Sequence, residues 1–532
     1  PDYIYLIPQS EESIWSVSTG WDKNRKVYME FGIDYNRTFG LHKTTALILY
    51  NQSKYYSPSL QYYVPNAYQG LVGRLTYEYA SRYLAEFNMG YNGTENFAKG
   101  KRFGFFPAVS LGWVISEEKF FPKNNIVKYL KVRGSYGEVG NDQIGGDRFL
   151  YLPSSYGAAS DSGVNKYNFG LASNPYTSLM IVENKIGNPD LTWEKAKKMN
   201  VGVDINLFNN CLTASFDIFK EKRNNILANR STSPMIIGAN LPAYNFGEME
   251  NRGWEMDLNF RHHIQDFHYW ARFNYSFARN EIIYMDEVQK RYDYQMTTGR
   301  RKNQFFGLIF DGYYNSWEEI NALDRPKSSW SGNQLQPGDV KYVDVNQDGV
   351  IDDYDMVPIG YTPVPEIIYG FSFGAQYKGF DFSILFQGAD NVSIKYFGRS
   401  MWPFAKGEES AKSLIKERWT QERYEAGEKI TFPRLSLNPN GETDHNYRPS
   451  TLWIRDASYL RLKNLEVGYT FTGGFVKRLN LNSVRLYFNG SNLFTWTDVV
   501  DLDPEAPSRS GNVEINTYPL QKVYNIGLNI NF

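Results

Sequence analysis

One twelve-residue stretch, 344–355, has the residue types and spacing of a cation-binding loop. It reads DVNQDGVIDDYD, with oxygen-bearing side chains at positions 1, 3, 5, 9 and 12 and a glycine at position 6. The calcium loop of an EF-hand has this spacing, and there the main-chain carbonyl of position 7 is a further ligand. The sequence therefore predicts a structural Ca²⁺ site, with Mg²⁺ as an alternative ion. Its ligands would be Asp344, Asn346, Asp348, Val350, Asp352 and Asp355.

Two features separate this stretch from an EF-hand. Position 12 is aspartate where an EF-hand has a bidentate glutamate, so the shorter side chain leaves the coordination incomplete or tightens the loop. The flanking residues look extended and not helical, so this would be the loop without its helices. The alternative interpretation is an acidic turn exposed to water.

No other pattern in the chain indicates chemistry. We find no G-x-S-x-G, H-E-x-x-H or G-x-x-x-x-G-K motif, and we expect no enzymatic activity. The single cysteine, Cys211, excludes an internal disulfide framework and a thiolate metal cluster. We interpret His262 and His263 as solvated turn residues. Four tryptophans in or beside long connections could stack on sugars, although packing or interfacial anchoring is their commoner role: Trp402, Trp419, Trp453 and Trp496.

The elements that hold these connections in place are predicted to be strands. In the C-terminal stretch 522–532, apolar residues alternate with Asn or Gly and the chain stops on Phe532, a pattern that suits the closing strand of a membrane barrel. About fifteen such runs recur. They are 27–35, 44–56, 71–79, 83–91, 102–116, 129–139, 199–207, 212–218, 254–260, 267–277, 367–377, 380–387, 459–471, 484–493 and 522–532.

Short and long connections alternate between these runs, so all long connections should lie at one end of the sheet. This asymmetry is typical of outer-membrane barrels, which have short periplasmic turns and long extracellular loops. The alternation slips by one residue within 462–465, which predicts a β-bulge. The predicted long loops are about 140–190, 226–253, 279–366, 390–458 and 494–521. The polar faces of the strands must line a wet interior, because they carry Glu30, Asp34, Glu78, Glu86, Asp204, Asp217, Glu255 and Asp257.

Composition and length narrow the choice further. No apolar run is long enough for a membrane helix, so a membrane protein of this sequence would span the bilayer with strands. The formal net charge of -1 gives no basic surface for nucleic acid. An odd number of strands with a periplasmic C-terminus would place residues 1–20 in an external loop. We therefore expect the whole chain, 1–532, to be the C-terminal part of a larger all-β, transmembrane antiparallel β-barrel in the bacterial outer membrane.

Several stretches together resemble the SusC/RagA family of TonB-dependent outer-membrane transporters. They occur in the family's order and span nearly the whole chain. They are YQGLVGRLTY at 68–77, KRFGFFPAVSLG at 101–112, KVRGSYGEVGND at 131–142, NPDLTWE at 188–194, the 344–355 loop preceded by PGD at 337–339, YLRLKNLEVGY at 459–469 and NGSNLFTWT at 489–497.

The resemblance implies a barrel of about 22 strands around a plug domain. It also implies a SusD-like surface lipoprotein that covers the mouth, a glycan or peptide substrate, and energy from the TonB complex. The family's plug, TonB box and first strands have no counterpart in this sequence. The expectation that TonB supplies the energy therefore rests on the family resemblance alone. The alternatives are a passive porin or surface adhesin on the same barrel and, less favoured, an outer-membrane hydrolase.

Overall fold

The computed structural model describes most of the chain. The described residues are 20, 23–60, 63–144, 148–158, 166–171, 176–179, 181–232, 241–330, 335–396, 402–404, 413–436, 444–500, 502–505, 512–513 and 520–532. Apart from Gly20, the predicted external segment 1–20 lies outside them.

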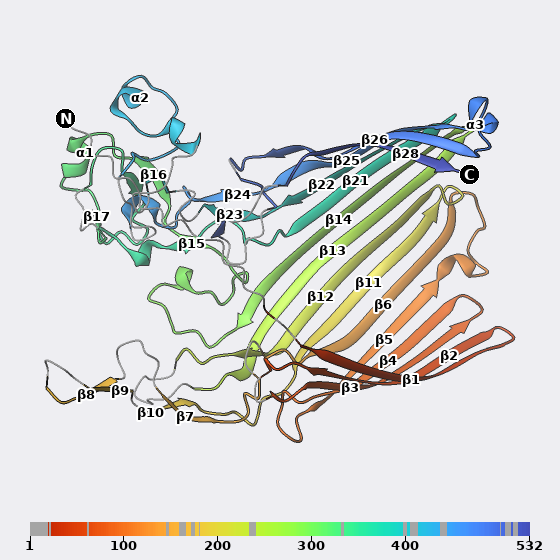
Figure 1. Cartoon of the computed structure of the whole chain (residues 1–532), viewed down its shortest axis with the longest axis horizontal. Helices are drawn as coiled ribbons and strands as arrows, with labels where there is room; N and C mark the ends of the chain where they lie inside the picture. The colour runs from red at the N-terminus through yellow and green to blue at the C-terminus, as the bar shows by residue number, and fades with distance from the viewer. Residues whose placement is uncertain are drawn as a thin grey trace.

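One antiparallel sheet of fifteen strands dominates the structure and curves into a trough (Figure 1). Each strand of this sheet is hydrogen-bonded to the sheet strands that come before and after it in the sequence, and β1 and β28 lie at the two edges. The sheet contains all fifteen predicted runs. Its strands are β1 Arg25–Phe39, β2 His42–Tyr56, β3 Asn66–Tyr79, β4 Tyr83–Thr94, β5 Phe103–Val114, β6 Val127–Asn141, β11 Glu194–Leu207, β12 Leu212–Ala228, β13 Tyr244–Ile264, β14 Phe267–Tyr284, β21 Ile367–Tyr377, β22 Phe380–Asp390, β25 Tyr459–Phe471, β26 Ser483–Thr497 and β28 Val523–Asn531.

The remaining elements are short and lie in the connections. The paired strands are β7 Ser154–Ala158 with β10 Ile181–Lys185, β8 Lys166–Phe169 with β9 Tyr176–Leu179, β15 Phe306–Gly307 with β20 Val357–Pro358, β16 Phe310–Tyr313 with β18 Val340–Tyr342, β17 Lys327–Ser328 with β19 Val350–Ile351, and β23 Ser393–Tyr396 with β24 Ile454–Asp456 and β27 Asn512–Val513. The helices are α1 Trp317–Asn321, α2 Gln421–Glu425 and α3 Phe475–Arg478, with 3-10 turns η2 Ile115–Glu117, η4 Asp293–Gln295, η5 Asp353–Asp355, η7 Ser413–Glu417 and η9 His445–Tyr447. None of the helices in the described residues is long and apolar enough to cross a membrane.

Connections of different length lie at opposite ends of the sheet, as predicted. In Figure 1 the long connections, with α1, α2 and β15–β17, gather at the left, and the short turns gather at the right with the C-terminus. A two-residue turn joins β21 to β22 through Lys378 and Gly379, whose φ angles are 44° and 92°. Two positive φ angles match the twist of the flanking strands, and glycine adopts such an angle without steric cost.

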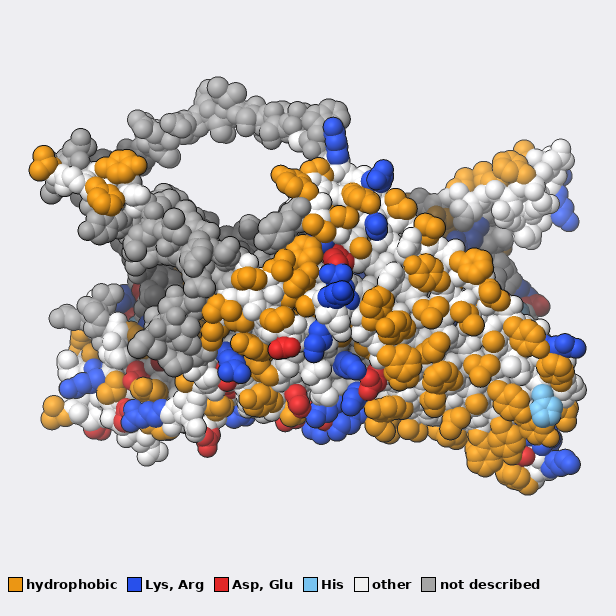
Figure 2. All heavy atoms as spheres, turned by 90° about the horizontal axis from the view of Figure 1, so that it is seen from below, with side chains coloured by type: hydrophobic (Ala, Val, Ile, Leu, Met, Phe, Trp, Pro, Cys, Tyr) orange, Lys and Arg blue, Asp and Glu red, His pale blue; other side chains and the backbone are white. Residues whose placement is uncertain are grey.

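The outer face of the sheet is apolar and exposed. On β28, Ile526 and Leu528 are 81% and 57% exposed, and Phe488 and Leu486 of β26 lie directly opposite them. Figure 2 shows hydrophobic side chains gathered toward the end with the short turns, followed by a band of charged side chains. An exposed apolar surface that runs across many strands is what a lipid-facing barrel requires.

Two local features concern the predicted boundaries. The strand register shifts where Leu462 and Asn464 of β25 pair and Lys463 is skipped, which confirms the bulge expected within 462–465. Strands β13 and β14 extend into segments that were predicted as loops, because β13 begins at Tyr244 and β14 ends at Tyr284. The ladder continues there through segments in which charged residues interrupt the alternation of apolar and polar side chains.

Candidate functional site

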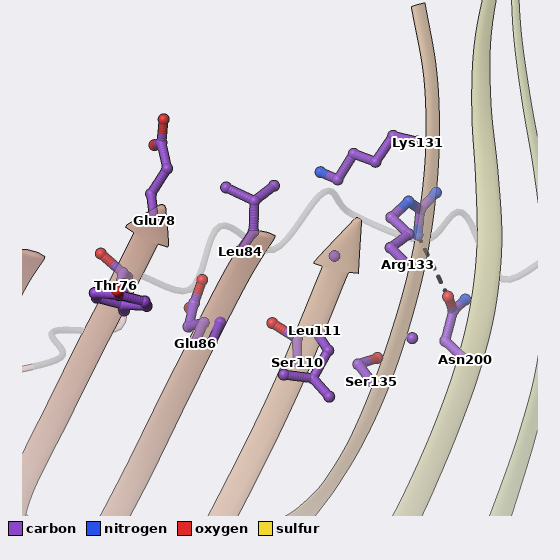
Figure 3. Close-up of a pocket in the computed structure, with 14 residues that line it drawn as sticks. Thr76, Glu78, Leu84, Glu86, Ser110, Leu111, Lys131, Arg133, Ser135 and Asn200 are labelled. Atoms are coloured by element: carbon purple, nitrogen blue, oxygen red, sulfur yellow. Dashed lines mark hydrogen bonds between the residues drawn. The ribbon is translucent and has the colours of Figure 1, made fainter. Parts of the chain in front are cut away.

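A polar cavity of about 330 Å³ lies on the concave face of the sheet (Figure 3). Because side chains alternate between the two faces of a strand, the polar residues of β3 to β6 and β11 converge on this face. Figure 3 shows Glu86 and Lys131 among the side chains over the strands, and Arg133 linked to Asn200. The labelled lining residues are Thr76, Glu78, Leu84, Glu86, Ser110, Leu111, Lys131, Arg133, Ser135 and Asn200.

Arg133 of β6 organises the wall of this cavity. Its Nη1 and Nη2 each donate a 2.7 Å hydrogen bond to Asp217 of β12, and its Nε donates to Asp204 of β11 at 3.1 Å. The Ser215 hydroxyl donates to Asp204 at 2.9 Å. The guanidinium of Arg133 thus connects β6, β11 and β12. It also gives Asp204 and Asp217 a cationic partner, without which the partial burial of two charged carboxylates would cost free energy.

The same arrangement recurs elsewhere on the concave face. Arg485 of β26 is paired with Asp381 of β22 and, at 2.6 Å, with Glu466 of β25. Arg74 is paired with Glu86 at 2.9 Å. Of the predicted interior carboxylates, Glu86, Asp204 and Asp217 therefore lie on the concave face beside arginine side chains. Such a surface can bind a polar solute without covalent chemistry.

The long connections form a second structural unit with its own core at the end opposite the short turns. The connections that follow β14, β22 and β26 supply this loop cluster, whose centre includes Leu308, Trp419, Trp453 and Val499. Trp453 is 3% exposed, and its ring lies 5.4 Å from that of Phe432. The loops are therefore packed against one another into a cap at this rim of the sheet.

Asp339 is a polar centre of the loop cluster. It is 3% exposed and accepts hydrogen bonds from Arg434 Nε at 2.6 Å and from Asn446 Nδ2 at 2.7 Å. Gly338 beside it has a φ of 92° and lies against Trp419, where a Cβ would approach the ring within 2.5 Å. These contacts give Gly338 and Asp339 of the PGD stretch a structural role in the loop cluster.

His445 of the loop cluster should make this cap sensitive to acid. Burial lowers the pKa of His445 below its ordinary value of 6.5, Asp339 and Asp444 oppose the shift, and Arg325 adds to it. As pH falls through 6.5 the unfolded cap takes up a proton that the folded cap resists, so stability present above pH 6.5 is lost below it. We expect the loop cluster to open at a lower urea concentration at pH 5.5 than at pH 7.5, as followed by tryptophan fluorescence. A His445→Gln variant should lose most of that difference, and an unchanged pH dependence would contradict the assignment.

The predicted cation loop, 344–355, lies at the edge of the loop cluster. Ile351, at position 8, is 4% exposed and belongs to the cluster's core, and β19 pairs with β17 beside it. The flanking segments β18 and β20 are extended, as expected, and η5 closes the loop. Gly349 has a φ of 82°, which permits the turn at position 6.

Backbone amides already contact the side chains of this loop. Asp344 accepts from the amides of Gln347 at 2.7 Å and Gly349 at 2.8 Å, and Asp348 accepts from that of Val350 at 2.9 Å. Both oxygens of Asp355 accept from backbone amides, and burial raises its pKa. Among the described residues, no three Asp, Glu, His or Cys side chains converge in a way that could hold a metal ion.

The tryptophans, histidines and cysteine singled out from the sequence do not lie in one site. Trp402, Trp419 and Trp453 are buried in the loop cluster, whereas Trp496 is 54% exposed on β26. Packing is therefore the role of the first three. His262 and His263 are exposed, as expected, but they lie at the end of strand β13 opposite Tyr269 and His268, so their prediction as turn residues is wrong. Cys211 is partly exposed in the turn before β12.

Sequence reasoning missed the buried Arg461. It is 2% exposed on β25 and pairs with Asp503 at 2.7 Å and Glu505 at 2.6 Å, both from the connection after β26. Arg461 falls on the polar side of YLRLK, but nothing in the sequence indicates which distant carboxylates it meets.

Comparison with known proteins agrees with this architecture. Residues 7–493 match the family model described as TonB dependent receptor-like, beta-barrel. The chain is 28% identical over 479 residues to TonB-dependent receptor P3 of Formosa agariphila, covering 86% of this chain and 45% of that protein. It is also 28% identical over 477 residues to TonB-dependent receptor SusC of Bacteroides thetaiotaomicron, covering 88% and 44% respectively.

A solved structure shares the fold. The RagAB peptide transporter superposes with a TM-score of 0.71 at 21% identity, covering 96% of this chain and 56% of that chain. The chain thus spans about half the length of the curated relatives it matches. These relatives are receptors and transporters, which agrees with the expectation of no enzymatic activity. The motifs, the fifteen-stranded sheet and the matched family together establish that the chain belongs to the TonB-dependent receptor-like β-barrels of the bacterial outer membrane.

Proposed function

We propose that this chain forms the barrel wall and loop cap of a transporter that imports a nutrient across the outer membrane with energy from TonB. The observation that carries the proposal is a concave wall of fixed ions beneath a packed loop cluster. Such a wall offers hydrogen bonds to a polar solute, and the packed loops can present a defined surface at the mouth.

The proposed substrate is an oligosaccharide or a peptide. The likeness to SusC and to the RagAB peptide transporter supports this substrate class. A SusD-like lipoprotein is the proposed partner, and the loop cluster is the surface on which it would dock. The buried tryptophans of that cluster stiffen the surface, and their burial keeps them from stacking on a sugar.

Uptake by intact cells tests the proposal. Cells that carry the complete protein should accumulate one class of labelled oligomer, oligopeptide or oligosaccharide, and an uncoupler that collapses the proton gradient should abolish the accumulation. Deletion of the gene should have the same effect. Uptake that persists with the uncoupler would indicate a passive porin, and the absence of uptake with retained cell adhesion would indicate an adhesin.

We further propose that the 344–355 loop binds Ca²⁺, with Mg²⁺ as a weaker alternative. An ionised carboxylate has about four lone-pair sites, so the amide contacts leave capacity for a cation. To hold the ion, the side chains of Asp344, Asn346, Asp348 and Asp352 would have to turn toward one point beside the Val350 carbonyl, because in the structure they do not form a metal-binding group. Asp355 is occupied on both oxygens by backbone amides, and we expect it to complete the site only weakly. The bound cation would fix the loop against β17.

Calorimetry on the detergent-purified protein tests the calcium site. We expect binding in the range of about 10⁻⁴ to 10⁻³ M, typical of extracellular calcium modules. The double variant Asp344→Ala/Asp348→Ala should bind at least about tenfold more weakly, because two anionic ligands are lost. Asp353→Asn at non-ligand position 10 is the matched control and should bind normally. Equal affinities in the wild type and the double variant would reject the site.

A further inference from the structure

Four neighbouring strands carry a cation immediately beyond their apolar outer surface. On β11, β12, β13 and β14 the last apolar outward residues are Met199, Ile218, Trp254 and Phe277. The next outward position, two residues closer to the long connections, is basic on every one of the four strands. These basic residues are Lys197, Lys220, Arg252 and Arg279. The band of charged side chains in Figure 2 lies between the hydrophobic surface and the loops.

The strand register places several of these cations beside one another. Arg252 lies directly opposite Lys220 on one side and opposite Arg279 on the other, and Lys197 lies opposite Lys222. Like charges directly opposite on neighbouring strands are destabilising. Diagonal ion pairs relieve part of this repulsion, at 2.8 Å from Lys220 to Glu250 and 2.9 Å from Lys222 to Glu248.

A polar cavity of about 380 Å³ lies at the β14 end of this basic row. Four guanidinium-bearing residues line it, two from the sheet and two from the connection that follows β14. They are Arg252, Arg279, Arg300 and Arg301. The carboxylate among the lining residues is Glu281. We call this cavity the arginine pocket.

The four arginines of the pocket differ in their partners. The buried Glu366 pairs with Arg301 and, at 2.8 Å, with Arg279, so these two guanidiniums are held in place from behind. Within the described part of the chain, neither Arg252 nor Arg300 has a carboxylate at ion-pair distance. The pocket therefore combines two anchored cations with two that remain available to an anion.

We propose that the arginine pocket and the adjoining basic row bind the phosphate group of a lipid in the outer leaflet of the membrane. The pocket directly adjoins the apolar surface at Phe277 and Trp254, the height at which lipid headgroups meet a barrel. Arginine forks match phosphate oxygens bidentately. Arg252 and Arg300, which have no carboxylate at ion-pair distance among the described residues, therefore complement an anion. The lipid's acyl chains would lie on the apolar surface below. This ligand is structural and distinct from the transported solute.

Native mass spectrometry of the complete, detergent-purified protein tests the lipid site with monophosphoryl lipid A as the probe. We expect the wild type to bind it at least about tenfold more tightly than its dephosphorylated form, because charge-assisted contacts to phosphate are lost. Arg252→Gln/Arg300→Gln should abolish this preference and leave the ion pairs of Glu366 intact. Arg300→Gln alone, outside the sheet, should weaken it without affecting folding. Lys378→Gln, in a turn at the opposite end, is the matched control and should bind as the wild type does.

Three results would overturn the lipid site. The first is equal binding of the phosphorylated and dephosphorylated lipids by the wild type. The second is an unchanged preference in a correctly folded Arg252→Gln/Arg300→Gln variant. The third is full displacement of the lipid by millimolar inorganic phosphate, which would indicate a site for free anions.

Discussion

Replacing Arg461 with methionine is expected to detach the connection after β26 from the barrel wall. The substitution keeps the apolar stem of the side chain but leaves Asp503 without its cation and Glu505 with Lys463 alone. Breaking a buried ion pair by removing one partner costs about 3 to 5 kcal/mol, because the remaining charge stays desolvated. Hydrogen exchange of residues 498–500 and 502–505 should accelerate by the corresponding factor, while exchange in β3 to β5 should not change.

Lys463→Met is the matched control for this experiment. Lys463 also pairs with Glu505, at 3.3 Å, but its side chain is 29% exposed, against 2% for Arg461. A partly exposed pair of this kind contributes about 1 kcal/mol or less. If Lys463→Met and Arg461→Met accelerate exchange equally, Arg461 is not the residue that holds this connection.

Replacing Trp453 with alanine is expected to loosen the loop cluster while the barrel stays folded. Trp453 packs between Phe432 and Tyr447, and its indole N–H donates to the Asn446 carbonyl at 2.8 Å. Truncating a buried tryptophan to alanine costs about 3 to 5 kcal/mol through lost burial and the cavity that remains. Limited proteolysis should cut the loops of the variant much faster, and heat-modifiable migration of the barrel on gels should be retained.

Trp496→Ala provides the comparison for the core position. Trp496 is 54% exposed on β26 and does not belong to the core of the loop cluster, so its removal should leave the proteolysis of the loops unchanged. If Trp453→Ala leaves the loops as resistant as the wild type, the cluster is not held by its buried aromatic core. If it unfolds the barrel as well, the two units are not separable.

The strands could be predicted from the sequence because their signal is local. Alternation of apolar and polar residues marks each strand, as in Ile526, Leu528 and Ile530, and a slip of one residue marked the bulge at Lys463. The ends of β13 and β14 could not be predicted in this way, because charged residues such as Arg252 and Arg279 interrupt the apolar alternation there.

The loop cluster could not be predicted, since its contacts join residues far apart in the chain. Leu308, Trp419 and Val499 come from three different connections, and no periodicity links them. The ion pairs of Asp339 with Arg434 and of Arg461 with Asp503 could not be predicted either. A charged residue in the sequence does not show which distant residue it will pair with. The spacing of residues 344–355 predicted a turn at Gly349 between extended flanks, which the structure has, whereas calcium binding by this loop stays a prediction.

The central claim is that this sheet lies in the outer membrane with its long connections outside the cell, and cysteine accessibility tests it most directly. The native Cys211 lies in a short turn, and Leu323 lies fully exposed in the connection between β14 and β21. In intact cells, a membrane-impermeant maleimide should label Leu323→Cys in a Cys211→Ser background and should leave the wild-type Cys211 unlabelled until the outer membrane is opened. Labelling of Cys211 in intact cells, together with protection of Leu323→Cys, would contradict the account.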